Sequence, residues 1–339
     1  MSKNDLTTML AIDYPIIQAP MAGVTTPEFV AASAEAGVLG SVGAGYLSAE
    51  DTRQFIREVQ KRTDKAFAVN LFVPEHVEMN QLYLREAYEA LQPIGQQLGM
   101  PFWKAPLSES EFDGQVQVLI EEGVKIASFT FGLPDEKTVR LLKEHGVHVI
   151  GTATTVEEAT LAEQSGMDAV VVQGSEAGGH RGSFAGELTL IPLAKLLPEV
   201  VAAVEIPVIA AGGIATKAHM EQALLAGAQA VQIGTALLAT DESGAHPKYK
   251  QAIFEAEEGC TTLTKAFSGK TARGIRNQFI MDMRDAVLAP YPYQNDLTKG
   301  IRKAAAAQGK SEFMSLWAGE SVHLTQDGSV KAIIERFVE

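Results

Sequence analysis

The sequence has very little cysteine. Cys260 is the one cysteine among 339 residues, which excludes an internal disulfide and a zinc site built from cysteines. We expect no metal site and a protein of the reducing cytoplasm. Basic charge is also scarce, since 28 Lys and Arg residues stand against 42 Asp and Glu residues and leave a net charge of −14. Nucleic acids and anionic membranes require a basic face, so neither is an expected partner.

Long apolar runs are absent as well. No run reaches the roughly 18 residues that a membrane-spanning helix needs, and the N-terminus MSKNDLTTMLAIDYP lacks the pattern of a signal peptide. Hydrophobic residues still make up 46% of the chain and charged residues 21%, which suits a globular protein with a sizeable core. The sequence therefore predicts a soluble cytoplasmic protein, either a monomer or a homodimer.

Five segments repeat one pattern, in which a helix end is followed by a glycine and a short apolar strand. The glycines are Gly37, Gly123, Gly146, Gly166 and Gly227. Glycine just past a helix allows the left-handed turn that reverses the chain. Helix starts are marked by Thr26, Ser48, Thr154 or Thr155, and Thr216. Strand-like apolar runs occupy 15–19, 38–43, 66–72, 125–131, 148–153, 169–174, 208–213 and 230–235.

These repeated units predict a (β/α)8 barrel, an α/β fold of the TIM-barrel type. An open doubly wound sheet is the alternative, because periodicity does not prove that a sheet closes. We expect the barrel over residues 1–259, with an insertion at 73–112 that carries a helix over the barrel mouth. Residues 260–339 are expected to fold back over the mouth as a cap.

Two glycine turns follow the last two predicted strands. The seventh strand ends in Gly212 and Gly213, and the eighth in Gln232, Ile233, Gly234 and Thr235. Loops at these places in TIM barrels often bind phosphate, and glycine lets backbone N–H groups approach it closely. The alternative is that the glycines only form tight turns; the pair on neighbouring strands favours a phosphate site.

Neutral amides end several strands. Asn70 and Gln173 close apolar strands, and Gln18 precedes the turn formed by Ala19, Pro20 and Met21. Buried amides need hydrogen-bond partners. Loop capping could supply them, but several such groups at strand ends also suit an uncharged flat heterocycle. An isoalloxazine ring with one phosphate, FMN, fits this description.

The stretch VVQGSEAGGHRGSF places His180 behind Gly178 and Gly179 at the end of the sixth strand. Histidine is readily poised as a base near neutral pH, and its position at a barrel strand end distinguishes it from a structural surface histidine. We interpret Glu176 and Arg181 as solvated loop charges.

Several motifs resemble those of the nitronate monooxygenase family, formerly called 2-nitropropane dioxygenases, in its class I form. They are IIQAPMAG, VNLFVP, VVQGSEAGGHRGSF, PVIAAGGI, VQIGTALLAT, AFSGKTARGIRN and YPYQNDLT, in order over nearly the whole chain. The resemblance implies FMN, a TIM barrel, and oxidation of alkyl nitronates such as propionate 3-nitronate by O2 to carbonyl compounds and nitrite or nitrate, without NAD(P)H.

The resemblance also implies roles for individual residues. His180 would be the catalytic base or the group that orients the nitronate. Tyr291, Tyr293 and Lys299 would lie near the substrate entrance. The FMN site would contain Gln18, Ala19, Pro20, Met21, Asn70, Gln173, Gly178, Gly179, Gly212, Gly213, Gln232, Ile233, Gly234, Thr235, Ser268 and Arg273.

Three alternatives remain at the level of the sequence. An FMN-dependent enoyl-acyl-carrier-protein reductase and an NADH:quinone reductase share the scaffold and would both oxidise NAD(P)H. A barrel that binds a phosphorylated ligand without redox chemistry is the third. The PMAG turn, the FSGKTARGIRN run and the YPYQN segment favour the monooxygenase.

Overall fold

Eight parallel strands form a closed barrel, and each lies within one of the eight predicted segments. The computed structural model describes residues 4–75, 77–78, 80–105 and 107–339, so that residues 76, 79 and 106 of the insertion lie outside the described residues. Hydrogen bonding follows the order β1-β9-β8-β6-β5-β4-β3-β2. A parallel bridge between Ile17 and Leu39 joins β1 to β2, which excludes the open sheet. The strands are β1 (Ile16–Gln18), β2 (Gly40–Gly43), β3 (Phe67–Phe72), β4 (Ile126–Thr130), β5 (His148–Ala153), β6 (Ala169–Gln173), β8 (Val208–Ala211) and β9 (Ala230–Ile233).

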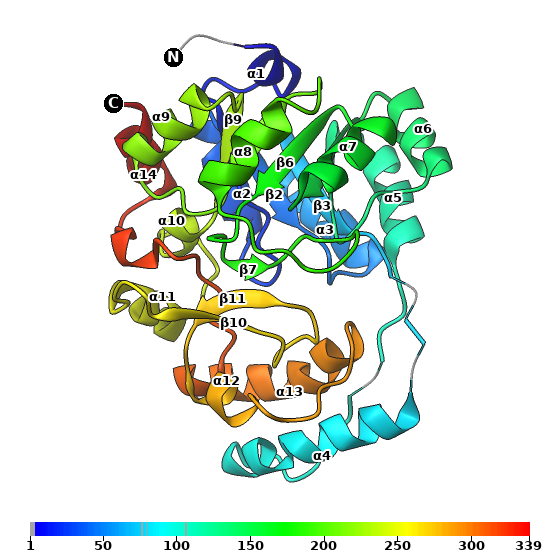
Figure 1. The fold of residues 1–339 in the computed structure, drawn as a ribbon, viewed down its shortest axis with the longest axis vertical. Coiled ribbons are helices and arrows are strands. Elements are labelled where there is room, and N and C mark those ends of the chain that lie inside the picture. The colour runs from blue at the N-terminus through cyan, green and yellow to red at the C-terminus, as the bar shows by residue number, and fades with distance from the viewer. Residues whose placement is uncertain (1–3, 76, 79, 106) are drawn as a thin grey trace.

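Helices alternate with these strands and cover the outside of the barrel (Figure 1). The five predicted helix-ending glycines all have positive φ, between 66° and 104°. Thr26, Ser48, Thr155 and Thr216 cap helices as predicted. Among the described residues, every helix is too short or too polar to cross a membrane. The outer helices are α2 (Pro27–Glu35), α3 (Ala49–Gln60), α5 (Phe112–Glu121), α6 (Glu136–Glu144), α7 (Val156–Gln164), α8 (Leu193–Val201), α9 (Lys217–Leu225) and the short α10 (Thr235–Leu238).

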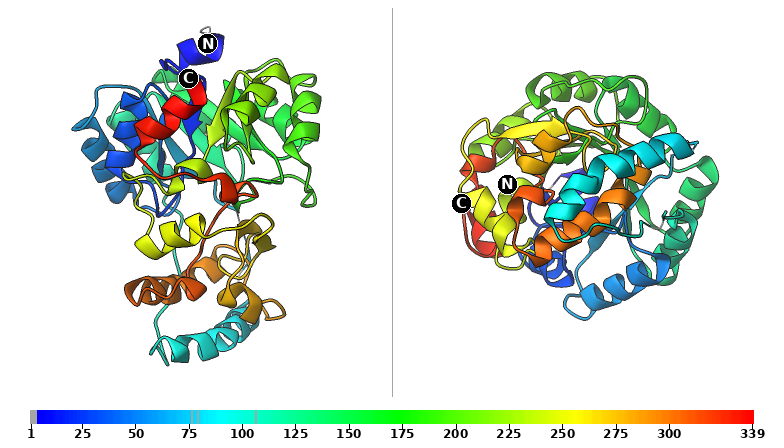
Figure 2. Two further views of the ribbon diagram at one scale, coloured as in Figure 1. Left: turned by 90° about the vertical axis from the view of Figure 1, so that its left-hand side faces the viewer. Right: turned by 90° about the horizontal axis from the view of Figure 1, so that it is seen from below.

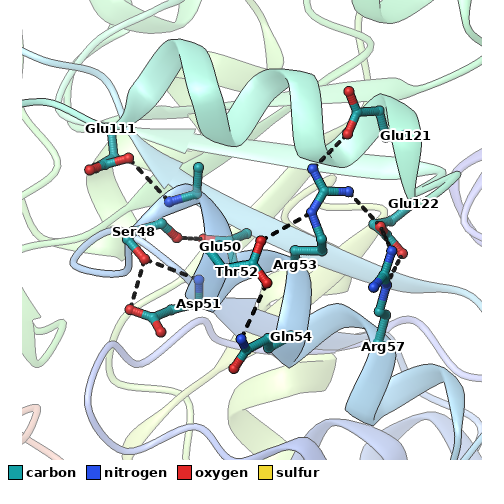
Figure 3. Close-up of polar contacts among 11 residues, drawn as sticks. Ser48, Glu50, Asp51, Thr52, Arg53, Gln54, Arg57, Glu111, Glu121 and Glu122 are labelled. Atoms are coloured by element: carbon teal, nitrogen blue, oxygen red, sulfur yellow. Dashed lines mark hydrogen bonds and ion pairs between the residues drawn. The ribbon is translucent and has the colours of Figure 1, made fainter.

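Ion pairs fasten α3 to the end of α5 on the outside of the barrel (Figure 3). The Arg53 guanidinium lies 2.6 Å from Glu121 and 2.7 Å from Glu122, and that of Arg57 lies 2.8 Å from Glu122. Hydrogen bonds from Arg57, followed by those from Arg53, lower the pKa of Glu122. Near the start of α5, Glu111 accepts a 3.2 Å hydrogen bond from the N–H of Ala49. These contacts hold α5, the first helix after the insertion, against α3 on the barrel.

Apolar side chains close one end of the barrel interior. Ile17, Ile126 and Ile209 are buried in an inner cluster. The short α1 (Asp5–Met9) covers that end, because the side chains of Leu6 and of Leu10, just after α1, are fully buried in the same cluster. The opposite end, where the strands have their carboxyl ends, carries the polar strand-end residues.

A second hydrophobic cluster covers those carboxyl ends. It is built largely on α4 (Gln81–Gln97), α11 (Pro247–Phe254), α12 (Gln278–Asp282) and α13 (Tyr293–Ala307). Strand β10 (Thr261–Thr264) pairs with β11 (Ala272–Ile275), which pairs with β7 (Gly179–His180). We call α4, α11, α12, α13, β10 and β11 the cap. Because β7 belongs to the loop after β6, this small sheet ties the cap to the barrel.

Helix α4 lies on the outer side of α13, at the end of the molecule farthest from the barrel (Figures 1 and 2). The Trp103 indole, which follows α4, donates a 2.9 Å hydrogen bond to the carbonyl of Leu297 in α13. The insertion does carry a helix, but α13 separates that helix from the barrel mouth.

The last helix, α14 (Val330–Val338), leaves the cap and returns to the barrel. Its buried side chains Val330, Ile333 and Phe337 belong to the cluster around the barrel strands, and it packs against α2 and α9. Helix α1 and the C-terminus both lie at the barrel end of the elongated molecule (Figures 1 and 2). Residues 260–339 thus divide between the cap and the outer wall of the barrel.

Candidate active site

A cavity lies where the carboxyl ends of the barrel strands meet the cap. It receives loops from several strands, together with Tyr249 and Trp317 from the cap side. The predicted site residues that line it are Ala19, Pro20, Met21, Asn70, Gln173, Gly178, Gly179, His180, Gly212, Gly213, Gln232, Gly234 and Thr235. The barrel therefore gathers most of the residues that the motifs single out.

Gln18 and Ile233 do not face this cavity. The Gln18 side chain is fully buried; its oxygen accepts a 2.8 Å hydrogen bond from the Ser41 N–H and its amide donates to the Ser41 carbonyl at 3.2 Å. It joins β1 to β2 at the seam where the barrel closes. Ile233 packs in the core around the strands. Neither residue lines the cavity, and their predicted contact with the cofactor stays a prediction.

Arg273, Tyr293 and Lys299 also lie outside the cavity lining. Arg273 pairs with Glu320 at 2.8 Å and donates to the Ser175 carbonyl at 3.2 Å, so it ties β11 to the loop after β6. The Tyr293 hydroxyl donates to the carbonyl of Val77 at 3.1 Å, and Lys299 is exposed on α13. Tyr293 and Lys299 therefore do not line the cavity, and their predicted place near the substrate entrance stays a prediction.

The glycine turns leave backbone donors free at the cavity wall. Gly212 and Gly213 have φ of 111° and 71°, a conformation that L side chains rarely adopt. Within the part of the chain that the structure describes, the backbone N–H groups of Gly213, Ile214 and Gly234 have no hydrogen-bond partner. Ile214 is buried, and Gly213 and Gly234 are half-buried at the cavity wall. Because backbone donors in such places are usually paired, this wall suits a ligand with acceptor oxygens.

The two amides at strand ends differ in what they hold. Asn70 donates to the hydroxyls of Ser128 at 3.0 Å and Thr130 at 3.1 Å. Gln173 donates to the carbonyl of His180 at 3.0 Å and accepts from the Gly182 N–H at 2.9 Å. Gln173 therefore fixes the loop that carries the histidine, while part of its side chain borders the cavity.

His180 projects into the cavity from β7. Its Nε2 lies 2.7 Å from the hydroxyl of Ser268, and its ring lies 5.7 Å from the Phe131 ring and 5.3 Å from the Trp317 ring. Burial, followed by the positive charges of Arg302 and Lys270, lowers the His180 pKa to about 3. Although part of the ring borders the cavity, this enclosure keeps the imidazole neutral at physiological pH.

Glu176 and Arg181 are not solvated loop charges, contrary to the sequence-based interpretation. Arg181 is 1% exposed and donates to the carbonyls of Gln173 at 2.8 Å and Gly174 at 2.5 Å. The Glu176 carboxylate accepts from the N–H of Leu193 at 3.0 Å, at the start of α8. Both side chains satisfy backbone groups of the loop after β6, which explains why a charged residue is retained inside the protein.

Several aromatic residues of the site escaped the sequence analysis. Phe131 and Tyr46 line the cavity from barrel loops. Tyr291, which was predicted near the substrate entrance, does not line the cavity itself; its ring lies 5.3 Å from that of Phe131, and its hydroxyl hydrogen-bonds to Tyr46. Phe131 has φ of 72° without being glycine. The sequence IASFTF shows only an apolar strand, and no residue pattern announces that backbone conformation.

Comparison with known proteins gives a consistent result. The family model described as "Nitronate monooxygenase" matches residues 3–339. A probable nitronate monooxygenase of Staphylococcus saprophyticus is 44% identical over 98% of this chain and 96% of its own length, and one of Staphylococcus haemolyticus is 43% identical over 99% and 96%.

Solved structures share the fold of this chain, with different degrees of structural similarity. The nitroalkane oxidase of Streptomyces ansochromogenes has a TM-score of 0.92 and 36% identity, covering 98% of this chain and 96% of its own. FabK of Thermotoga maritima has a TM-score of 0.79 and 33% identity, covering 100% and 96%. With a full-length family match and relatives above 40% identity, the chain belongs to the nitronate monooxygenase family of oxidoreductases.

Proposed function

We propose that this protein is an FMN-dependent enzyme that oxidises alkyl nitronates, such as propionate 3-nitronate, with O2 to carbonyl compounds and nitrite or nitrate. The observation that carries the proposal is the composition of one cavity. Unpartnered N–H groups of two glycine turns, neutral amides and a neutral imidazole all border it. Family membership supports nitronate oxidation as the reaction class.

The residues present fit FMN. The free N–H groups of Gly213, Ile214 and Gly234 would hold the phosphate, because backbone donors at a glycine turn match phosphate oxygens. Asn70 and the loop of Gly178 and Gly179 would contact the ring system. FMN, when bound, supplies the redox chemistry that no side chain here can supply.

His180 would orient the nitronate. The Ser268 hydroxyl sits between the histidine Nε2 at 2.7 Å and the Lys270 carbonyl at 3.1 Å. If the hydroxyl proton points to Nε2, the ring carries its proton on Nδ1 and can donate to a nitronate oxygen. If the hydroxyl donates to the Lys270 carbonyl, Nε2–H donates to Ser268 and Nδ1 can accept a proton. The direction of the Ser268 hydroxyl proton therefore determines whether the free nitrogen of His180 is a hydrogen-bond donor or a base.

The low pKa of His180 favours a preformed nitronate as substrate. A general base works best when its pKa lies near the working pH, and an imidazole with a pKa of about 3 is far from it. Proton removal from a neutral nitroalkane is therefore slow in this site, whereas a nitronate needs only binding and orientation.

The proposal is tested by oxygen consumption and by the flavin released on denaturation. The purified protein should release FMN, consume O2 with propionate 3-nitronate, and form nitrite without NAD(P)H. NADH or NADPH oxidation with an enoyl thioester or a quinone, and none of the nitronate reaction, would replace the proposal by one of the reductases. Absence of flavin after reconstitution with FMN would leave a phosphate-binding barrel without redox chemistry.

A further inference from the structure

Lys270 lies beside the cavity in an unusual environment for a lysine. Its ammonium sits 4.6 Å from the centre of the Phe131 ring and 5.6 Å from that of Tyr291. Its side chain is 14% exposed and forms an ion pair with Glu75, whose side chain is 36% exposed. An ammonium held over two aromatic faces keeps its charge while losing most of its water, so a second anion could replace Glu75.

The Lys270 charge reaches the reacting end of the cavity. Phe131 lines the cavity and contacts the His180 ring edge-on, with 5.7 Å between ring centres. The N–H of Lys270 donates to the Ser268 hydroxyl at 3.2 Å, and that hydroxyl also contacts His180. Lys270 and His180 are thus linked through one serine and one aromatic ring.

The backbone of Phe131 adopts an unfavourable conformation, and this conformation sets the position of its ring. A φ of 72° is strained for a bulky side chain, and such strain persists where the surrounding structure requires it, often at functional sites. The strain places a ring that touches both Lys270 and His180. This observation is independent of the ion pair.

We propose that Lys270 determines specificity by binding the anionic substituent of the substrate, exchanging Glu75 for a substrate carboxylate. The proposal rests on the proposed nitronate oxidation and adds the group that selects among nitronates. Propionate 3-nitronate carries a carboxylate two carbons from its reacting carbon. With the nitronate at His180, that carboxylate would lie on the Phe131 side of the cavity, beneath the ammonium.

Glu75 makes the selection reversible. In the empty site it neutralises Lys270, and it lies on the segment after β3 rather than on a rigid element. A substrate carboxylate competes with Glu75 for one ammonium, and the exchange replaces one charge-assisted contact with another of the same kind. A nitronate without a carboxylate gains nothing from the exchange.

The test compares Lys270→Gln with Lys265→Gln, which makes the same charge change at an exposed lysine outside the cavity. Substrates are propionate 3-nitronate and propyl-1-nitronate, in which a methyl group replaces the carboxylate. Lys270→Gln should lower kcat/KM for the carboxylated substrate about 10- to 100-fold, mainly through KM, as expected for losing a charge-assisted contact. Propyl-1-nitronate feels the Lys270 charge only through the groups around His180, so its loss should be at least about fivefold smaller than that of propionate 3-nitronate, and Lys265→Gln should match the parent.

Glu75→Gln provides an opposite test. Removal of the competing carboxylate should raise kcat/KM for propionate 3-nitronate about 3-fold or more and leave propyl-1-nitronate unchanged. Equal losses on both substrates in Lys270→Gln, or a loss on propionate 3-nitronate in Glu75→Gln, would overturn the role of Lys270. Flavin content and melting temperature of each variant separate these outcomes from misfolding.

Binding of 3-nitropropionate by calorimetry separates this inference from the proposed function. If the parent oxidises neither nitronate but binds 3-nitropropionate, and Lys270→Gln weakens that binding about tenfold or more, the reaction assignment fails and the Lys270 site stands. If neither the parent's affinity nor its turnover depends on Lys270, the site is refuted while nitronate oxidation stands.

Discussion

His180 shows how one residue acquires its properties from its neighbours. Its strand pairs with β11, its Nε2 contacts Ser268, and two aromatic rings enclose it. Burial among these groups removes water from the imidazole, and two cations add to the cost of protonation. The residue is therefore better suited to hydrogen bonding with an anion than to abstracting a proton.

Replacing His180 with Asn separates these two roles. Asn keeps a polar group but removes the basic nitrogen. With a neutral nitroalkane, a fall in turnover of about 10²- to 10⁴-fold would identify the histidine as the base, contrary to what its low pKa leads us to expect. With the corresponding nitronate the loss should be smaller and mostly in KM, since only orientation is lost. Steady-state kinetics on both forms decide this; equal losses would make His180 purely electrostatic or structural.

The low pKa of His180 also predicts how stability depends on pH. The unfolded chain takes up a proton at its ordinary pKa of about 6.5, whereas folded His180 does so only near 3. Stability should therefore fall as pH decreases through this window, because the unfolded state binds more protons. His180→Asn should remove about 1 kcal/mol of that fall between pH 7 and pH 5, less than the full shift implies since cavity water screens the ring. Urea unfolding at both pH values measures it, and identical pH dependence in parent and variant would contradict it.

For single residues, the sequence predicts the cavity residues that lie at strand ends. It does not predict those that reach the cavity through an unusual backbone conformation. Asn70, Gln173 and His180 follow apolar runs, so their place at the mouth is readable from the chain. Gln18 follows the same pattern but is used to close the barrel. Phe131 depends on a φ of 72° that its neighbours impose. A single sequence does not contain that constraint.

Among the elements, the loop after β6 is held by a buried carboxylate. Glu158 of α7 is fully buried; it accepts from the Thr154 N–H and hydroxyl at 2.6 and 2.7 Å, and from the N–H groups of Phe184 and Ala185 at 2.5 and 2.9 Å. Together with the buried Arg181, it fixes this loop on both sides of His180. The loop is thus preorganised by side chains outside the cavity.

Glu158→Gln should loosen this loop. An amide offers one acceptor oxygen where the carboxylate offers two, so at least one donor group loses its partner and the NH2 group meets backbone donors. Hydrogen bonds to a charged group are worth about 1.5–3 kcal/mol, and we expect a loss of stability of about that size with a rise in KM. Glu157→Gln, at an exposed neighbour on the same helix, should change neither. Urea unfolding and steady-state kinetics measure the stability and the KM of both variants. If Glu158→Gln behaved like Glu157→Gln, Glu158 would not hold the loop in place.

Element order was predictable because glycine and threonine mark where helices end and begin. The cap was less predictable. Helix α4 packs on α13, more than 180 residues further along the chain, through contacts such as that of Trp103 with Leu297. Contacts across such separations depend on the finished fold, so the sequence predicted a covering segment but not its layers or the return of α14 to the barrel.

For the whole molecule, the cavity lies between two hydrophobic clusters. Its wall takes Gly213 and Gly234 from the barrel and Trp317, Gly319 and Ser321 from the segment that leaves the cap. Two hydrogen bonds join these sides directly. The N–H of Gly319 donates to the Thr235 hydroxyl at 2.9 Å, and the Ser321 hydroxyl donates to the Gly213 carbonyl at 2.9 Å. A ligand here therefore touches both sides at once.

Cofactor binding should consequently stabilise the molecule as a unit. A ligand that binds only the folded protein raises stability by RT ln(1 + [L]/Kd), which is about 2.7 kcal/mol at 100 times Kd. Because the proposed FMN site spans both clusters, we expect the protein without flavin to melt at a lower temperature and over a broader range, and FMN to restore a single sharp transition. Two glycine variants test the phosphate site. Gly213→Val places a branched side chain at a φ of 71° beside Glu176, whereas the Cβ added by Gly234→Ala would meet only an ordinary 3.4 Å contact with Ala19. Gly213→Val should therefore reduce the stabilisation by FMN more than Gly234→Ala. Calorimetry with and without FMN tests this; a melting curve that FMN leaves unchanged would remove the cofactor from the cavity, and equal effects of the two glycine variants would assign the phosphate elsewhere on its wall.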